Sequence, residues 1–331
     1  MKYTQNAINI LTAKSYKGIG NAWIVKNLTG NESVDAIVSK ISNKTGITIE
    51  DFECKKKHFE KLIQKFEDFC DGLVALGDPN FPKYRGNVKD SEQPVFLYYK
   101  GDINLLNIDN KNITVIGLLN PEGDIEERER KFVTEFVKNG ATIVSGLAFG
   151  CDSISHRQAL DSNGKTVAIL PSPLNNILPA RNKGLAHEIV VEGGLLITEY
   201  GNDFKSAMEL SSRYKERDRL QALFCDTIIL AASYAQDSAQ YWDHLSGQKL
   251  DSGARLAMGY AKDYNIPRAV MYDQNSDVNN PMFDLNRQLI KEQANISIIS
   301  QDNLLETVKK IIAKKPDVKN KTGYQARLFG S

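Results

Sequence analysis

The residues whose types and spacing suggest chemistry lie in one stretch, Thr142 to Arg157, where a run of β-branched residues leads through serine and glycine into a helical pattern. Ser145, Gly146 and Gly150 lie at the end of the run, and Asp152 lies at the start of the helical pattern. Glycine lets the backbone approach a ligand closely, and a helix N-terminus offers unpaired N–H groups and the positive end of its dipole. The stretch therefore predicts a phosphate-binding turn, although plain strand-to-helix connections share the same pattern.

The elements around this turn alternate between strand and helix. Continuous apolar strands are predicted at residues 113–117, 141–144, 166–170, 195–198, 227–230 and 268–271. Helices are predicted between them at residues 124–138, 152–161, 182–192, 213–224 and 253–264. This order predicts an α/β fold with a Rossmann-like, doubly wound, mostly parallel sheet that is covered on both faces. Ligands of such sheets bind at the carboxyl ends of the strands, where the turn at 145–146 lies.

Four regions are predicted along the chain. Residues 1–75 predict a small helical domain, in which Lys17-Gly18-Ile19-Gly20 is similar to a helix-hairpin-helix turn or to a purely structural helical hairpin. Residues 76–110 predict an irregular connector that ends in a β-rich run at 94–102. The Rossmann-like domain is expected over 111–314, and residues 315–331 are expected to form a polar tail.

Composition limits the classes of function. The chain has 331 residues, 41% hydrophobic and 25% charged, which is typical of globular domains. The 42 basic residues nearly balance the 41 acidic ones, so a site for a polyanion has to be a local patch. The four cysteines form no C-x-x-C pair, and we expect no metal and no cofactor. Without a signal-like or membrane-spanning apolar run, we expect a cytoplasmic protein with no membrane contact.

The string from Ser145 to His156 resembles the S-G-L-A-x-G-x-D-x-x-x-H signature of the DNA-processing protein A (DprA/Smf) family. Further stretches resemble the pattern of that family in the same order, at residues 78–82, 94–102, 177–186, 217–230, 252–254 and 284–298. The resemblance runs from about residue 76 to 308. It implies a protein that binds single-stranded DNA without sequence preference, as a homodimer and without catalysing a reaction.

The resemblance also implies a pathway and a set of contacts. Such proteins act in DNA uptake, recombination or phage defence, and hand the strand to a RecA-type recombinase. Backbone N–H groups at Ser145-Gly146 and at Ser252-Gly253 would hold phosphates. The charged and polar side chains expected beside them are those of Arg181, Asn182, Lys183, Arg217 and Arg219.

Several of these side chains also have a purely structural interpretation. Arg213, Arg217 and Arg219 alternate with Glu216 and Asp218, so they would also suit ion pairs on an exposed helix. His156 has no second histidine or cysteine cluster nearby, which favours a structural hydrogen bond over a metal ligand. Asp152 is expected to cap its helix rather than to act in acid–base chemistry.

The chain departs from the family pattern at three places. The G-S-R expected after the first strand is Gly117-Leu118-Leu119, which lacks the arginine. The asparagine expected between Arg217 and Arg219 is Asp218. An insertion at residues 239–249, with Tyr241, Trp242 and His244, precedes Ser252.

These departures leave a second function open, in which the same pocket holds a nucleotide or a nucleotide-derived signal as a sensor or a hydrolase. Hydrolases of the wider Rossmann-like group have a P-G-G-x-G-T motif, but Gly193-Gly194 lacks its proline, third glycine and threonine. An NAD-dependent oxidoreductase would need G-x-G-x-x-G after the first strand, where residues 117–122 contain one glycine and a proline. The NAD-dependent oxidoreductase is therefore set aside.

Overall fold

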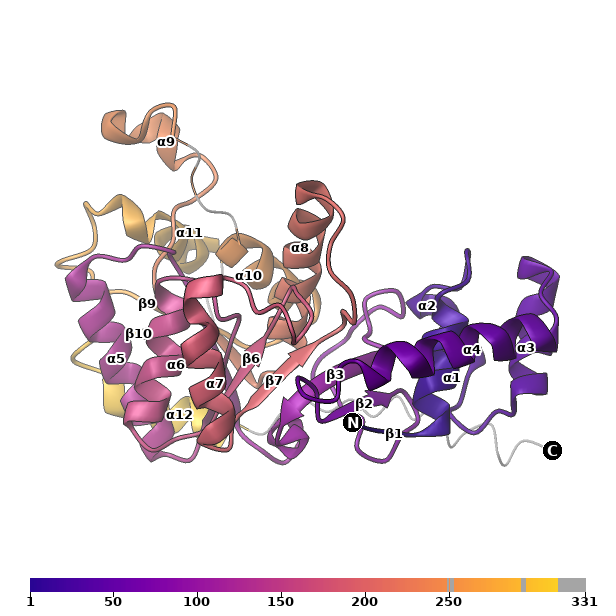
Figure 1. The fold of residues 1–331 in the computed structure, drawn as a ribbon. Helices are drawn as coiled ribbons and strands as arrows, with labels where there is room; N and C mark the ends of the chain where they lie inside the picture. The colour runs from indigo at the N-terminus through magenta and orange to yellow at the C-terminus, as the bar shows by residue number, and fades with distance from the viewer. Residues whose placement is uncertain (249, 251–252, 293–295, 315–331) are drawn as a thin grey trace, which may run out of the picture.

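The computed structural model describes residues 1–248, 250, 253–292 and 296–314. Within these residues, ten strands form one sheet in the order β1-β2-β3-β7-β6-β5-β4-β8-β9-β10, with helices packed against it (Figure 1). The strands from β4 to β10 pair in parallel throughout. The predicted α/β, Rossmann-like fold with a mostly parallel sheet is confirmed.

The strands are short and, in the centre of the sheet, fully buried. Their bounds are β1 (Lys2–Tyr3), β2 (Gly72–Ala75), β3 (Phe96–Gly101), β4 (Asn112–Ile116), β5 (Thr142–Ser145), β6 (Thr166–Ile169), β7 (Leu195–Thr198), β8 (Thr227–Leu230), β9 (Arg268–Met271) and β10 (Ser297–Ile299). Every residue of the five strands β4, β5, β6, β7 and β8 is buried. Burial on both faces explains why these strands are continuous apolar runs rather than alternating ones.

Helices cover both faces of the parallel strands. They are α5 (Gly123–Lys138), α6 (Cys151–Asp161), α7 (Lys183–Val191), α8 (Ala207–Leu223), α10 (Gly253–Asp263), α11 (Asp284–Glu292) and α12 (Leu304–Ala313), while the short α9 (Ser238–Tyr241) projects from the domain. One layer contains α12, α5, α6 and α7, each in contact with the next, and α8 packs against α10 in the other layer. Helix α8 begins six residues before the predicted start at Arg213, because Ser206 caps it by accepting from the backbone N–H of Glu209.

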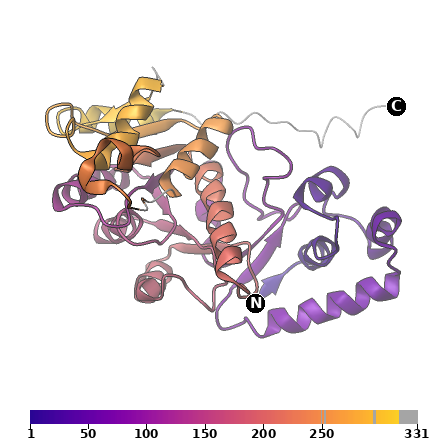
Figure 2. The ribbon, with the colours of Figure 1, turned by 90° about the horizontal axis from the view of Figure 1, so that it is seen from above.

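The N-terminal helices form a separate layer, which Figure 2 shows beside the main body. They are α1 (Gln5–Lys14), α2 (Asn21–Asn27), α3 (Val34–Thr45) and α4 (Ile49–Gln64). Thr48 and Asp51 form a capping box that starts α4. Strands β1 and β2, which flank these helices, join the large sheet through the antiparallel pairs β2–β3 and β3–β7. The sheet thus continues across the predicted boundary near residue 75.

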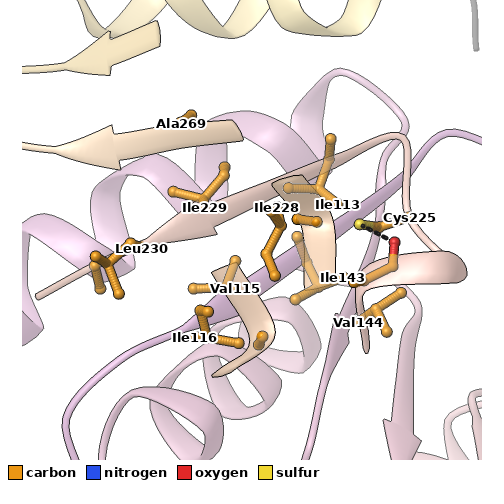
Figure 3. Close-up of a cluster of buried hydrophobic side chains, with 14 of the residues drawn as sticks. Ile113, Val115, Ile116, Ile143, Val144, Cys225, Ile228, Ile229, Leu230 and Ala269 are labelled. Carbon is orange, nitrogen blue, oxygen red and sulfur yellow. Dashed lines mark hydrogen bonds between the residues drawn. The ribbon is translucent and has the colours of Figure 1, made fainter. Parts of the chain in front are cut away.

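The core of the parallel sheet consists of branched aliphatic side chains from neighbouring strands. Figure 3 shows Ile113 and Val115 of β4 among Ile143 of β5 and Ile228 and Ile229 of β8. None of these five side chains is exposed to solvent. Burying a side chain of this size contributes roughly 1.5–3 kcal/mol, so the core fixes the strand ends that carry the site.

The carboxyl ends of β4 and β8 mark the switch point of the sheet. The chain adds β5, β6 and β7 on one side of this pair and β9 and β10 on the other. The backbone at Gly117, after β4, lies against Cys151 at the start of α6 and against the carbonyl of Ala232 after β8. Three loops therefore meet at the edge where open α/β sheets bind their ligands.

Candidate nucleic-acid interface

The loop that follows β5, the Gly146 loop (residues 146–150), is fixed at both ends. Ser145 donates from Oγ to the carbonyl of Val115 at 2.7 Å, which ties the end of β5 to β4. Leu147 has φ +58° and is fully buried. Gly150 has φ +66°, and a Cβ there would lie 2.1 Å from the carbonyl oxygen of Leu118. Glycine at 150 is thus required both by backbone conformation and by close packing.

Asp152 lies inside α6 and turns back toward the Gly146 loop. Its Oδ2 accepts from the backbone N–H of Gly146 at 3.1 Å and from that of Ala148 at 3.3 Å. The residue at the N-cap is Gly150, without a side-chain capping bond, so the prediction that Asp152 caps the helix is wrong. Burial raises the pKa of Asp152, and the charge of Arg217 opposes that rise. The N–H group of Gly146, which was expected to meet a phosphate, is thus bonded to a carboxylate of the protein itself, and so is the N–H group of Ala148.

Arg217 fills the space above Gly146. Its Nη1 lies 3.6 Å from Oδ2 of Asp152, and its Nε lies 3.2 Å from Oδ1 of Asp218. A Cβ at residue 146 would lie 1.3 Å from Nη1 of Arg217. The absence of a side chain at Gly146 is therefore what lets the buried guanidinium reach Asp152.

The other arginines of α8 also have carboxylate partners. Arg219 donates to both carboxylate oxygens of Glu199, at 2.8 and 2.7 Å, and is 6% exposed. Arg213 donates to Glu209 at 2.6 Å. The interpretation of these residues as ion-paired is the one that the geometry supports, but their helix face is buried rather than exposed. Asp218, the departure from the family pattern, belongs to this buried network.

Arg181 and Lys183 lie beside the Gly146 loop and are exposed. Between them, Asn182 donates from Nδ2 to the carbonyls of Leu147 and Ala148, at 2.8 and 3.2 Å. It also donates to Oγ of Ser153 at 3.0 Å, which ties the short helix η2 (Ala180–Asn182) to the loop. Asn182 therefore holds the loop, and its two sequence neighbours are exposed cationic residues.

Buried polar side chains underlie the loop. His156 makes a 2.7 Å hydrogen bond to Oγ1 of Thr166, which confirms its expected structural hydrogen bond, and burial lowers its pKa to about 3. Glu129 of α5 accepts from Oγ of Ser155 at 2.6 Å, and burial raises its pKa to about 8. In the described ranges, no cluster of three or more histidine, cysteine, aspartate or glutamate residues is arranged to hold a metal ion.

Four further positions complete the comparison with the sequence analysis. Ser252 lies outside the described residues, and Gly253 is the first residue of α10. Leu119, in the place of the expected arginine, is exposed in the loop that follows β4. Phe149, which the sequence analysis did not single out, is also exposed and lies within the Gly146 loop itself. Its position, an aromatic residue inside a predicted phosphate-binding turn, is the signal that could have drawn attention to it, because aromatic rings can stack on bases.

Comparison with known proteins places this site in a family. The family model described as DNA recombination-mediator protein A matches residues 72–241, which is more than half of the chain. The chain belongs to this family. The matched range contains the Gly146 loop, Arg181, Lys183 and α8, so the resemblance to DNA-processing protein A is confirmed.

Individual members of the DNA recombination-mediator protein A family align over different lengths. The DNA processing protein DprA of Streptococcus pneumoniae is 28% identical over 222 residues, which are 65% of this chain and 74% of that protein. Protein Smf of Borreliella burgdorferi is 32% identical over 140 residues. That match covers 42% of this chain and also 42% of the Borreliella protein, less than half of either.

Solved structures of the family share the fold. The crystal structure of Streptococcus pneumoniae DNA processing protein A has a TM-score of 0.66 at 22% identity, and the match covers 92% of this chain and 98% of that one. DNA processing protein A from Helicobacter pylori, solved to describe its single-stranded DNA binding mode, has a TM-score of 0.55 at 26% identity. That match covers 72% of this chain and 95% of the other.

No described helix has the length and apolar character needed to cross a bilayer.

Proposed function

We propose that this chain binds single-stranded DNA along the carboxyl edge of its sheet, without catalysing a reaction. The observation that carries the proposal is the placement of exposed Arg181 and Lys183 on both sides of Asn182, which is bonded to the Gly146 loop. Cations that neutralise phosphates supply most of the affinity of sequence-independent binding. The Helicobacter pylori relative, with its single-stranded DNA binding mode, supports the same ligand.

In this proposal, the buried arginines support the loop rather than contact the strand. Arg217 and Arg219 are each 6% exposed and face carboxylates, so a phosphate would have to displace a buried ion pair to reach them. Within the part of the chain that the structure describes, the backbone N–H groups of Phe149 and Gly150 have no acceptor. These two groups, together with Arg181 and Lys183, are the donors we assign to the phosphates.

The proposal extends to partners. The family description names a recombination mediator, which supports transfer of the bound strand to a RecA-type recombinase. A homodimer would let one strand cross two such edges and raise the effective concentration of the second contact.

The charges at the carboxyl edge provide the test. Arg181→Ala with Lys183→Ala is expected to weaken binding of a labelled single strand. It should also flatten the slope of log affinity against log salt by about 0.7 for each lost phosphate contact, or about 1.4 in all. Fluorescence anisotropy over a salt series measures both quantities.

A matched control removes the same charge from the opposite edge of the sheet. Lys138 and Lys165 are exposed, and lie at the end of α5 and just before β6. Lys138→Ala with Lys165→Ala is expected to leave the slope unchanged. If both double variants alter binding equally, the effect is one of net charge and the proposed interface is wrong.

A further inference from the structure

A short projection, the Tyr241 arm (residues 235–246), stands beside the proposed interface. It contains α9 and the helical turn η3 (Asp243–Leu245), and in Figure 1 α9 extends away from the rest of the domain. The arm follows β8, one of the two strands that flank the switch point. Most of it lies in the stretch that is inserted relative to the family pattern, so the family resemblance assigns it no role.

The arm is anchored at its base. Oδ2 of Asp284, at the start of α11, accepts from Oγ of Ser238 at 2.6 Å and from Nε1 of Trp242 at 2.8 Å. Oδ1 of Asp284 also pairs with Arg287. Leu245 is buried at the other end of the arm. Tyr241, between these anchors, is 75% exposed.

Strand order places the arm across the interface from a second projection. Helix α8 follows β7, and near its start Met208 is 83% exposed. The ends of β6, β5 and β4 lie between those of β7 and β8 in the sheet. Arg181 lies in the segment that follows β6, the Gly146 loop follows β5, and Leu119 lies in the loop after β4. The two projections therefore flank the proposed phosphate contacts.

We propose that Tyr241 is a base-stacking residue for a single strand that lies across this edge. The inference rests on the proposed function and adds a contact to the bases, where Arg181 and Lys183 contact the phosphates. Every base has a π-face, so stacking suits binding without sequence preference. An aromatic side chain on an anchored arm also loses little freedom on binding.

The test separates stacking from charge. We would measure the affinity of the full chain and of Tyr241→Ala for a labelled thymidine oligonucleotide and for a strand of the same length built from abasic sites. Loss of one stacked base is expected to weaken binding of the normal strand by about 5- to 150-fold. Binding of the abasic strand is expected to be unchanged, because it has no base to stack. Tyr241→Phe keeps the ring and should bind both strands like the unaltered chain.

Phe69→Ala is the matched control. Phe69 is an exposed aromatic residue, but it precedes β2 at the opposite edge of the sheet, and its removal should change neither affinity. Equal binding of the normal strand by Tyr241→Ala and the unaltered chain would overturn the inference and leave the proposed function intact. A loss that is equal on the abasic strand would overturn it too, since the contact would not be to a base. Failure of the unaltered chain to bind either strand would overturn the proposed function and this inference together.

Discussion

At the scale of single residues, Gly146 illustrates how a motif glycine can serve packing. A glycine in this turn suggests room for a phosphate, but the space above it is filled by the guanidinium of Arg217. That guanidinium is the positive charge closest to the buried carboxylate of Asp152, which holds the backbone N–H groups of the loop. The glycine, the arginine and the aspartate thus form one unit that shapes the loop.

This unit predicts strong coupling between residues 146 and 217. Gly146→Ala is expected to destabilise the fold by about 1–3 kcal/mol, because its Cβ displaces Arg217. Arg217→Ala should cost about 3–5 kcal/mol by leaving Asp152 buried without its cation. The double variant should cost clearly less than the sum, since the alanine methyl group then has room. Denaturant unfolding of the three variants measures the coupling.

Gly184→Ala is the control for the alanine substitution. Gly184 lies in α7, and a Cβ there meets no atom within 4 Å, so this change should be neutral or slightly stabilising. If the losses in unfolding free energy of Gly146→Ala and Arg217→Ala simply add up in the double variant, the two residues act independently and the predicted coupling is wrong.

At the scale of elements, α5 and α6 are joined by a buried polar contact. Glu129 of α5 is fully buried and bonds Ser155 of α6, and no partner for its second carboxylate oxygen lies among the described residues. Burial disfavours the charged form and raises the pKa of Glu129 to about 8. In the unfolded chain the same carboxyl group has an ordinary pKa near 4.3.

This difference predicts the direction in which stability depends on pH. Because the folded state holds the proton more tightly, the contribution of Glu129 is fully present below the unfolded pKa and is lost as pH rises through about 8. His156 acts in the opposite sense: its pKa is lowered to about 3, so its contribution is lost as pH falls below the ordinary value near 6.5. Glu129→Gln should flatten the loss of stability between about pH 5 and 9 without changing the acid side. Thermal melts of both proteins over that pH range measure this effect. If the variant and the unaltered chain lose stability in parallel, Glu129 is not the group responsible.

At the scale of the whole molecule, the parts that follow from local pattern were predictable from the sequence. The apolar run at 113–116 and the Gly146 stretch predict a strand and a strand-to-helix turn because each signal lies within a few neighbouring residues. The partner of Arg219 was not predictable, because Glu199 lies 20 residues away on another element. The pairing of β2 with β3 likewise depends on tertiary packing, and the position of Tyr241 beside the interface depends on strand order.

The measurement that tests the central claim most directly compares three ligands on the full chain: a labelled single strand, the matching duplex and free nucleotides, each over a salt series. We expect the single strand to bind more tightly than the duplex, with an affinity that falls steeply with salt because each neutralised phosphate releases counterions. Free nucleotides should compete poorly, since they offer only one or a few of the phosphates that the carboxyl edge contacts. Equal or tighter binding of the duplex, or saturable binding of a free nucleotide that a single strand cannot displace, would contradict a strand-binding edge.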